Sequence, residues 1–295
     1  MSKAGEINSL SKLIKPHIGI ITNIGEAHIE NFKNIKGVAK AKAEIIDNIK
    51  KNGTIILNHD DKFFNFLAKK AKSKRLKIVS FGKNKKSDIC LIRTFRVKNF
   101  NRMVVRIDRH NFDLKVKNIN IYNVLASLAI LNELNLNFSK ILKNFKNFEP
   151  IEGRGKTHNI TRYNKKFKLI DESYNANPLS VKNAINNFNS IKKKKIKKYL
   201  ILGDMLELGR NSEMYHRDLS KVINSSDIDK VFIKGQKTLF TYKNIIKKKR
   251  GNIFQNDDDI DLTLKNIISN NDYLMVKGSN ATGLNILSKK MIKGL

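Results

Sequence analysis

Polar side chains stand beside glycine or follow an apolar run in five short segments, which are the places where this chain can do chemistry. The first segment is 22–28, TNIGEAH, in which His28 follows a run of apolar residues. A histidine at the end of a buried strand can bind a metal ion or a phosphate group. It can equally be a surface or hydrogen-bonded structural histidine, which is the commoner case for a histidine taken alone. Lys42 likewise has two interpretations, as a functional amine or as a solvated lysine on a lysine-rich helix.

The second segment, Gly153-Arg154-Gly155, has a composition that suits phosphate. The two glycines free the backbone, and the arginine can hold a phosphate group through two parallel hydrogen bonds. The stretch ends in the letters GKT and so imitates a phosphate-binding loop. The pattern G-x-x-x-x-G-K-S/T would need glycine at position 150, where this chain has Pro150, and a strand before the loop, where a helix is predicted. We therefore reject a phosphate-binding loop at this point.

The remaining segments are 170–178, 202–209 and 276–280, and each includes the end of an apolar run. Segment 170–178 reads IDESYNANP, and its acids and amides can bind ribose hydroxyl groups, a metal ion or an amine. Residues of these types also cap helices and shape turns without any other duty. Each segment alone is therefore weak evidence for a site. The segments can form a site only if the fold brings them together.

Apolar runs bounded by turn residues alternate with segments of helical period along the chain. This alternation is typical of a parallel sheet covered by helices, so we predict an α/β fold. The predicted strands are 17–24, 54–57, 77–81, 89–97, 103–107, 167–170, 199–202, 230–233 and 273–276, with 89–97 and 103–107 as a hairpin. The predicted helices are 35–48, 62–71, 119–134, 213–223 and one that opens at Pro178.

A break in the pattern at 148–150 predicts a domain boundary. We expect residues 1–150 to form a partial central domain on a parallel sheet, and residues 151–295 to form a complete Rossmann-like C-terminal domain. The second half lacks the G-x-G-x-x-G fingerprint of dinucleotide binding. The five polar segments are expected at the carboxyl edges of strands, which predicts a cleft between the two domains.

The net charge of +33 raises the question of nucleic acid binding, because lysine and arginine neutralise phosphates. Only 11 of the 59 basic residues are arginine, and the basic runs at 192–198 and 247–250 have no interleaved aromatic residues. We interpret these runs as solvated surface and do not expect nucleic acid as the partner.

The composition of the chain also indicates the cellular compartment of the protein. A single cysteine, Cys90, cannot form an internal disulfide, and no Cys/His cluster has the spacing of a zinc site. No stretch reaches the roughly 18 to 20 uninterrupted apolar residues of a membrane span, and the first residues lack an apolar signal core. We therefore expect a cytoplasmic protein without a membrane partner.

Eight motifs in series along the chain resemble those of the Mur ligase family. They are TNIGEAHIENF, GVAKAKAEI, GTIILNHDD, IYNVLAS, GRGKT, IDESYNANP, LGDMLELG with His216-Arg217 downstream, and VKGSNATG. The resemblance runs from about Gly5 to the C-terminus, so it covers almost the whole chain. Within the family, SYNANP and GDMLELG are typical of the branch that adds D-alanyl-D-alanine. The other amino-acid-adding Mur ligases and the folylpolyglutamate synthases have different loops at these places.

The resemblance implies an enzyme that forms an amide bond with ATP and Mg²⁺ as cofactors. The carboxylate of UDP-N-acetylmuramoyl-tripeptide would take the γ-phosphoryl group and become an acyl phosphate. The amine of D-alanyl-D-alanine would then attack it, while Mg²⁺ and positive side chains balance the developing charge. The implied partners are these two substrates, and the implied process is peptidoglycan precursor synthesis.

The resemblance also implies roles for individual residues. His28 would be a Mg²⁺ ligand, and Lys42 would be the lysine that family members carbamylate, which turns an ammonium into an oxygen ligand suited to a hard cation. Arg154 would contact the phosphates and complete the catalytic set. The other implied contacts are Asn123 with the adenine, Asp171 and Glu172 near the ribose, Tyr174, Asn175 and Asn177 on the nucleotide and dipeptide side, and Lys277 and Ser279 with the substrate.

The chain also departs from the family pattern. Family members have a further N-terminal domain for the UDP-sugar, a P-loop and a Mg²⁺-binding glutamate before the point that matches Met1. Glu172 stands where aspartate is usual, Ile119 where histidine is common, and Asn280 where arginine often follows Lys-Gly-Ser. We therefore expect a truncated or split ligase that works only with a separately encoded N-terminal fragment. A non-catalytic nucleotide- or dipeptide-binding remnant and a basic nucleic-acid-binding protein are the alternatives that remain open.

Overall fold

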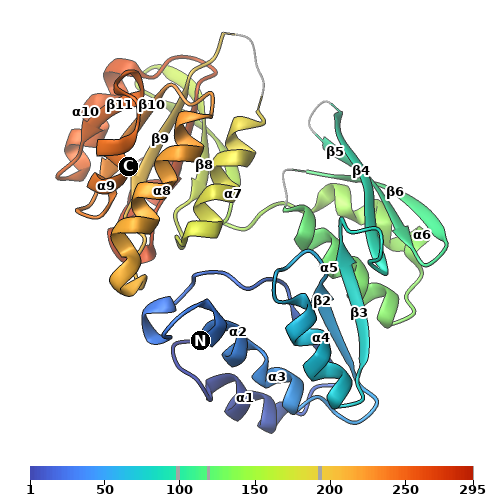
Figure 1. The fold of residues 1–295 in the computed structure, drawn as a ribbon. Helices are drawn as coiled ribbons and strands as arrows, with labels where there is room; N and C mark the ends of the chain where they lie inside the picture. The colour runs from blue at the N-terminus through green and yellow to red at the C-terminus, as the bar shows by residue number, and fades with distance from the viewer. Residues whose placement is uncertain (98–99, 118–119, 192–194, 295) are drawn as a thin grey trace. The chain divides into compact units, whose positions relative to one another are not determined.

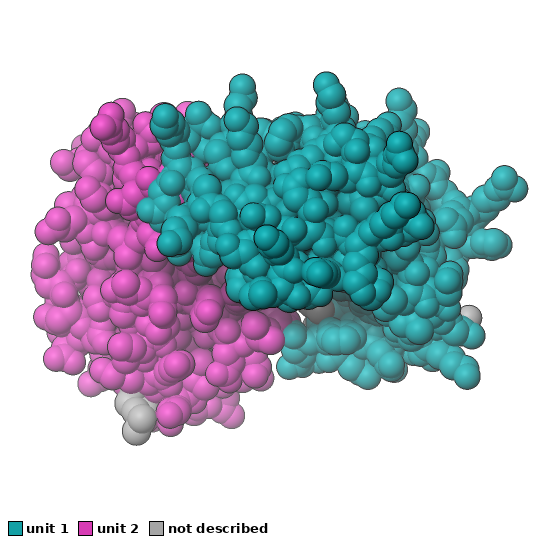
Figure 2. All heavy atoms as spheres, turned by 90° about the horizontal axis from the view of Figure 1, so that it is seen from below, with its two compact units in different colours: residues 1–25, 31–149 teal, residues 26–30, 150–295 magenta. Residues whose placement is uncertain are grey.

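The computed structural model describes residues 1–97, 100–117, 120–191 and 195–294 (Figure 1). Ile119 and the first part of the basic run at 192–198 lie outside the described residues. The chain divides into two compact units, residues 1–25 with 31–149 and residues 26–30 with 150–295, which Figure 2 colours separately. Each unit has a sheet of its own.

The first unit is built on a six-stranded sheet in the order β1-β2-β3-β4-β5-β6. β1 to β4 are parallel, whereas β5 and β6 continue the sheet as antiparallel strands. The strand bounds are Ile18–Ile21, Thr54–Asn58, Lys77–Gly82, Ile89–Val97, Phe100–Ile107 and His110–Val116. The helices are α1 (Glu6–Ile14), α2 (Ile35–Lys42), α3 (Glu44–Asp47), α4 (Phe64–Ser73), α5 (Ile121–Glu133) and α6 (Phe138–Ile141), with short 3-10 helices at Leu142–Asn147 and, at the boundary of the two units, Ile29–Asn31.

Burial explains why the first unit follows the apolar pattern of its sequence. Every residue of β2 is buried, as expected for a strand in the middle of a covered parallel sheet. The apolar helix α5 packs on this sheet, where Leu125 and Leu128 join Phe81 and Met103 in one core cluster. The α/β prediction and the predicted hairpin are confirmed. The predicted helix 35–48 is divided at Ala43, and the strand predicted at 17–24 is shorter.

The second unit is built on a six-stranded sheet in the order β11-β10-β9-β12-β8-β7. Five strands are parallel, and β7 pairs antiparallel with β8. The bounds of β7 to β12 are Lys156–Arg162, Lys165–Glu172, Lys198–Gly203, Lys230–Lys234, Arg250–Ile253 and Tyr273–Lys277. The helices are α7 (Pro178–Asn189), α8 (Ser212–Asn224), α9 (Thr238–Asn244), α10 (Asp257–Ile267) and α11 (Leu284–Lys293), with 3-10 helices at Gly209–Asn211, Lys247–Lys249 and Asn280–Thr282. No helix in the described part of either unit is long and apolar enough to cross a membrane.

The position of β12 decides which segments of the second unit meet. β12 lies between β8 and β9, and its last residue, Lys277, is in register with Glu172 of β8 and Leu202 of β9. Because the three strands are parallel, the polar segments that follow them emerge at the same edge of the sheet.

Local signals set the start of α7 and of β7. α7 opens at Pro178, as predicted, and the side-chain oxygen of Asn177 caps it by accepting the N–H of Ser180 at 2.9 Å. Lys156 of the GKT sequence is the first residue of β7. In a phosphate-binding loop, GKT would open a helix, so the strand agrees with the rejection of such a loop.

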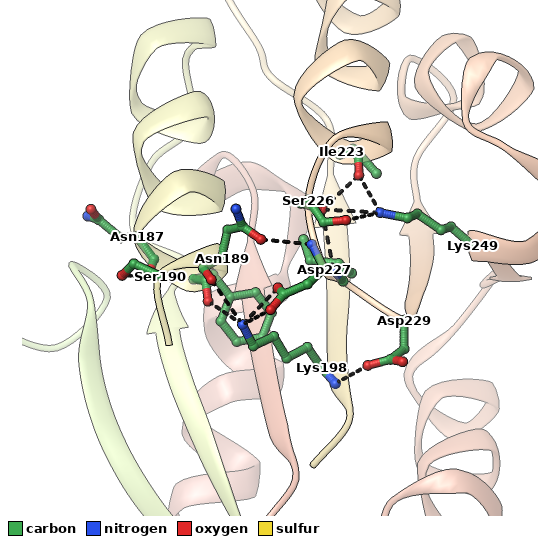
Figure 3. A network of polar contacts seen from close by, with 11 residues as sticks. Asn187, Asn189, Ser190, Lys198, Ile223, Ser226, Asp227, Asp229 and Lys249 are labelled. Atoms are coloured by element: carbon green, nitrogen blue, oxygen red, sulfur yellow. Dashed lines mark hydrogen bonds and ion pairs between the residues drawn. The ribbon is translucent and has the colours of Figure 1, made fainter. Parts of the chain in front are cut away.

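Two lysines of the basic runs are buried (Figure 3). Lys198 donates from Nζ to the carbonyl of Phe188 at 3.0 Å and to the carboxylate of Asp227 at 2.8 Å. Lys249 donates to the carbonyl of Ile223 at 2.7 Å. The prediction of solvated surface was therefore wrong for these two residues. The last carbonyls of a helix lack i+4 N–H donors, and the two ammonium groups add donors to carbonyls of α7 and α8 that the following turns also pair.

Candidate functional site

Three polar segments meet at the carboxyl edge of the second sheet, and Ser279 connects them. The Ser279 hydroxyl accepts a hydrogen bond from the N–H of Leu206 at 3.0 Å and donates one to the carbonyl of Ala176 at 3.3 Å. The N–H of Ser279 donates to the carbonyl of Asp204 at 3.0 Å. Ser279, after β12, therefore ties the segment after β8 to the segment after β9.

Lys277 holds the segment after β8 in place. Its side chain is 3% exposed, and its ammonium group donates to the carbonyls of Asn175 at 2.6 Å and Glu172 at 3.3 Å. The carboxylate of Glu172 lies 3.4 Å from the same nitrogen. Burial lowers the pKa of Lys277 and raises the pKa of Glu172, while the attraction between the two charges opposes both shifts. The three oxygen groups around the Lys277 ammonium group are thus all groups of the protein itself.

Asp171 shapes the Gly153-Arg154-Gly155 turn. Its buried carboxylate accepts hydrogen bonds from the N–H of Gly153 at 2.8 Å and the hydroxyl of Ser173 at 2.5 Å. Its carbonyl accepts the N–H of Gly155 at 2.7 Å. Gly153 and Gly155 have φ angles of +74° and +96°, which glycine adopts without the strain of a side chain. The acid and the two glycines together present Arg154 at the edge of the site.

Arg154 stacks on the ring of Tyr174. The guanidinium carbon lies 4.6 Å from the ring centroid, and both side chains are exposed. The N–H of Tyr174 donates to the carbonyl of Gly153 at 3.1 Å, which fixes the backbone of both partners. A guanidinium group that stacks through its face keeps its N–H groups free in its plane. The arrangement therefore suits the phosphate contact expected of Arg154.

The two asparagines of the segment after β8 have different surroundings. Asn177 caps α7, and its own N–H donates to the hydroxyl of Ser180 at 3.0 Å. The capping role, which the sequence left open as the alternative, is the one that Asn177 has here. Asn175 is exposed, and its side-chain oxygen accepts the N–H of Ala176 at 2.7 Å.

His28 packs within the second unit, through the segment 26–30. Its Nδ1 lies next to the carboxylate of Glu207, and the N–H of Glu30 donates to the carbonyl of Glu207 at 3.0 Å. His28 and Glu207 have φ angles of 56° and 59°, and such left-handed residues are concentrated at functional sites. The sequence analysis did not select Glu207, although its place after β9 in GDMLELG was the available signal.

His216 holds the segment after β9 in place through hydrogen bonds. Its side chain is buried, its Nε2 accepts the N–H of Met205 at 3.0 Å, and its Nδ1 lies 2.8 Å from the carbonyl of Ser212. An imidazole that accepts at Nε2 and donates at Nδ1 is neutral. Burial lowers the pKa of His216, in agreement with the neutral form.

Lys42 is half-buried at the end of α2 in the first unit. Its Nζ donates to the carbonyl of Asn23 at 2.9 Å. Burial lowers the pKa of Lys42, and the charge of Asp61 partly opposes this shift. The carboxylate of Asp61 also accepts the N–H of Ile24 at 2.7 Å, which links the ends of β1 and β2. Lys42 is therefore not the fully solvated helix lysine of the alternative interpretation.

A second acid after β2 was missed by the sequence analysis. Asp60 accepts the N–H of Lys83 at 2.6 Å and the hydroxyl of Tyr122 at 3.1 Å. Burial, with a contribution from Asp60, raises the pKa of Tyr122 to about 12. Asn123 follows in α5 and is exposed, so its adenine contact stays a prediction. The sequence feature that could have revealed Asp60 is the pair of acids, Asp60 and Asp61, that begins two residues after the buried strand β2.

Family models match both halves of the chain. A model described as the Mur ligase middle domain matches residues 1–131. A model described as the Mur ligase, glutamate ligase domain matches residues 158–280. The chain belongs to the Mur ligase family.

Curated Mur ligases are similar to this chain over nearly its whole length, but they are longer. The UDP-N-acetylmuramoyl-tripeptide–D-alanyl-D-alanine ligase of Buchnera aphidicola subsp. Baizongia pistaciae is 30% identical over 293 residues, which are 98% of this chain and 61% of the relative. The ligase of the same name from Bacillus subtilis is 28% identical over 297 residues, or 99% of this chain and 63% of the relative. The chain thus spans only part of the length of these relatives.

Solved Mur ligase structures share the fold. MurF from Thermotoga maritima in complex with ADP has a TM-score of 0.86 at 21% identity, covering 99% of this chain and 65% of that chain. MurF from Acinetobacter baumannii has a TM-score of 0.85 at 24% identity, covering 99% of this chain and 63% of that chain. These likenesses confirm the predicted fold class.

The predicted Mg²⁺ site of this Mur ligase chain stays a prediction. Among the described residues, no group of three or more His, Cys, Asp and Glu side chains is arranged to hold a metal ion. Lys42 and Asn123 belong to the first unit, and the other nine predicted site residues belong to the second. The cleft expected between the two domains is likewise a prediction.

Proposed function

We propose that this chain forms the middle and C-terminal domains of a cytoplasmic ligase that uses ATP to join D-alanyl-D-alanine to UDP-N-acetylmuramoyl-tripeptide. The observation that carries the proposal is the convergence of the SYNANP, GDMLELG and VKGSN segments on one sheet edge. Lys277 and Ser279 tie these segments together through main-chain oxygen and nitrogen atoms. The names of the curated relatives support the same reaction, which belongs to peptidoglycan precursor synthesis.

The nucleotide would be bound by three kinds of side chain. Arg154, stacked on Tyr174, would bind the phosphates through the N–H groups in its plane. Glu172, which replaces the more usual aspartate, would accept ribose hydroxyl groups, while Asp171 holds the turn that carries Arg154. The exposed amide of Asn123 would bind the adenine. We assign Asn175 to the dipeptide side, because it is exposed next to Tyr174.

The reaction would pass through an acyl phosphate. An oxygen of the substrate carboxylate attacks the γ-phosphorus of ATP, and ADP leaves. The amine of D-alanyl-D-alanine then attacks the carbonyl carbon of the acyl phosphate, inorganic phosphate leaves, and the nitrogen loses a proton as the amide forms. Arg154 would stabilise the negative charge on the transferred phosphoryl group.

The chemistry of Lys42 fits a role with Mg²⁺. Burial lowers its pKa, so more of its neutral amine is present than in a solvated lysine, and the neutral amine is the form that reacts with carbon dioxide. The carbamate oxygens would be ligands for a hard cation. His28 would contribute its Nε2, since its Nδ1 pairs with Glu207. Bound Mg²⁺ would supply positive charge next to the phosphate oxygens.

An assay of phosphate release tests this function. The chain is combined with a polypeptide that contributes the part of the Bacillus subtilis relative that it does not cover, and with ATP, Mg²⁺, the UDP-linked tripeptide and D-alanyl-D-alanine. We expect phosphate release that depends on the dipeptide and is lost in R154A. Release that depends on glutamate or a diamino acid would contradict the assignment to this branch of the family.

Two other outcomes would favour the alternatives. Binding of ADP or dipeptide by the chain without release in the combined assay would support a non-catalytic binding protein. DNA binding that falls steeply with salt, in the absence of ADP binding, would support a nucleic-acid-binding protein.

A further inference from the structure

A second binding site is suggested by a hollow at the amino edge of the second sheet. The hollow has a volume of about 880 Å³, which is within the usual range for small-molecule sites. It is lined by the beginnings of β9, β10 and β11 and by the last part of α10. Because these strands are parallel, this edge is the one opposite to the candidate site. We call it the basic hollow, after its charged lining residues Lys197, Asp229, Lys230, Lys248 and Arg250.

The charge of the basic hollow is strongly positive. Four of the five charged side chains are cations, and Asp229 is the one carboxylate among its described lining residues. That carboxylate accepts the N–H of Lys198 at 2.7 Å, so one of its oxygen atoms already has a main-chain donor. The hydroxyl of Tyr199 donates to the carbonyl of Ile267 at 3.0 Å, which occupies one of the acceptors at the end of α10.

Buried neighbours fix the backbone that carries two of these cations. Lys197 and Lys248 are exposed, but the next residue of the chain in each case, Lys198 and Lys249, is buried. The ammonium groups of Lys198 and Lys249 are bound to the C-terminal ends of α7 and α8. The backbone at both places is therefore fixed before any ligand arrives. Two basic runs that lie about 50 residues apart in the sequence converge on one hollow in this way.

The other two cations are fixed by hydrogen bonds of their own. Arg250 donates from Nε to the carbonyl of Ile245 at 3.0 Å and from Nη2 to that of Lys243 at 2.8 Å. Its guanidinium carbon lies 5.5 Å from the ring centroid of Tyr242, and Lys230 donates to the carbonyl of Arg250 at 3.2 Å. The two hydrogen bonds to the carbonyls of Ile245 and Lys243 use two of the five N–H groups of Arg250. Groups that are already ordered lose little entropy when a ligand binds.

We infer that the basic hollow binds a small anion with several negative charges, of the oligophosphate class. The volume of the hollow and the four cations among its lining residues favour a compact polyanion. The aromatic rings that line the hollow, Tyr199 and Phe232, are each 2% exposed, so no ring face is open for the base stacking that single-stranded nucleic acids use. The ligand is therefore a small molecule and not a nucleic acid strand.

Calorimetric titration of the full chain with inorganic tripolyphosphate at low salt tests this inference. K197Q/K248Q removes two exposed cations of the hollow, and K182Q/K289Q removes two exposed lysines of the same unit outside it. We expect the first variant to bind about tenfold more weakly, since each exposed charge contributes a few-fold in affinity. The control variant should remain within about twofold of the parent. R154A, which changes the candidate site at the opposite edge, should keep the binding event that K197Q/K248Q weakens.

Equal weakening in the two double variants would overturn the site, because the effect would then come from the net charge alone. Loss of tripolyphosphate binding in R154A would also overturn it, because the anion would then occupy the candidate site. A single-stranded oligonucleotide that binds more tightly than tripolyphosphate and depends on Lys197 and Lys248 would overturn the small-anion class. If K197Q/K248Q failed to keep the melting temperature of the parent, the single exchange K248E at an exposed position gives the same test.

Discussion

The ammonium group of Lys277 donates a hydrogen bond of 2.6 Å to the main-chain carbonyl of Asn175, 102 positions away in the sequence. The bond joins the end of β12 to the SYNANP segment after β8. The sequence predicts a substrate contact for Lys277, whereas these contacts indicate that it positions the segment. The two roles make different predictions for stability.

We expect Lys277→Met to lower the free energy of unfolding by about 3 kcal/mol, because the exchange leaves a partly buried carboxylate without its partner. This value is at the lower end of the usual range, since the Glu172 side chain keeps 22% of its surface exposed. Urea denaturation of the full chain measures the change. Lys182→Met, at an exposed position on α7, is the matched control and should stay within about 0.5 kcal/mol of the parent. Equal effects of the two exchanges would contradict the positioning role.

The stability of the second unit should fall in acid because of His216. Its pKa is lowered by burial from the ordinary value of 6.5, so the unfolded chain takes up the proton first as the pH falls. The stability that the neutral imidazole contributes is complete above pH 6.5 and is lost as the pH falls through the folded-state pKa. One such group gives a slope of at most about 1.4 kcal/mol per pH unit.

Thermal or urea unfolding between pH 5 and pH 8 shows this slope. In H216Q the slope should decrease, while H110Q, at an exposed position, should keep the slope of the parent. Part of the slope should survive in H216Q, because burial also lowers the pKa of His158. An unchanged slope in H216Q would show that His216 does not titrate on unfolding in this range.

Lys42→Ala should remove most of the activity of the combined enzyme while changing its melting temperature little. The reason is that the half-buried amine donates a single hydrogen bond among the described residues, to the Asn23 carbonyl, whereas its carbamate would serve the phosphoryl transfer. Added bicarbonate should raise the activity of the parent but not of the variant. Lys40→Ala, an exposed lysine of the same helix, should keep both the activity and the bicarbonate response. An active Lys42→Ala enzyme would return Lys42 to a structural interpretation.

Hydrogen exchange should be faster at β1 than at β9 and β12. In the described part of the first sheet, β1 is an edge strand that pairs with β2 alone. β9 and β12 each have neighbours on both sides, so their N–H groups open only with a large part of the second unit. Mass spectrometry of the exchanging chain measures the difference, and equal protection of the three strands would show that β1 is covered in solution.

Much of the local structure could be predicted from the sequence. The buried strands β2, β3, β9 and β12 stand out as apolar runs, and α7 begins where Pro178 indicates, because these features depend on neighbours in the chain. β7, β11 and the antiparallel β6 were missed. These three segments carry many polar residues, so the alternation that marks a buried strand is weak.

The sequence by itself determined that polar residues follow several strands and that their motifs are those of Mur ligases. Only the tertiary structure decided that β12 lies between β8 and β9, and so brings Lys277 to Asn175 and Ser279 to Ala176. Strand order results from the packing of segments far apart in the chain, and a local pattern does not contain it. The same reason applies to Lys198 and Lys249, because a lysine becomes a buried cap only where the end of a distant helix supplies carbonyls that accept its hydrogen bonds.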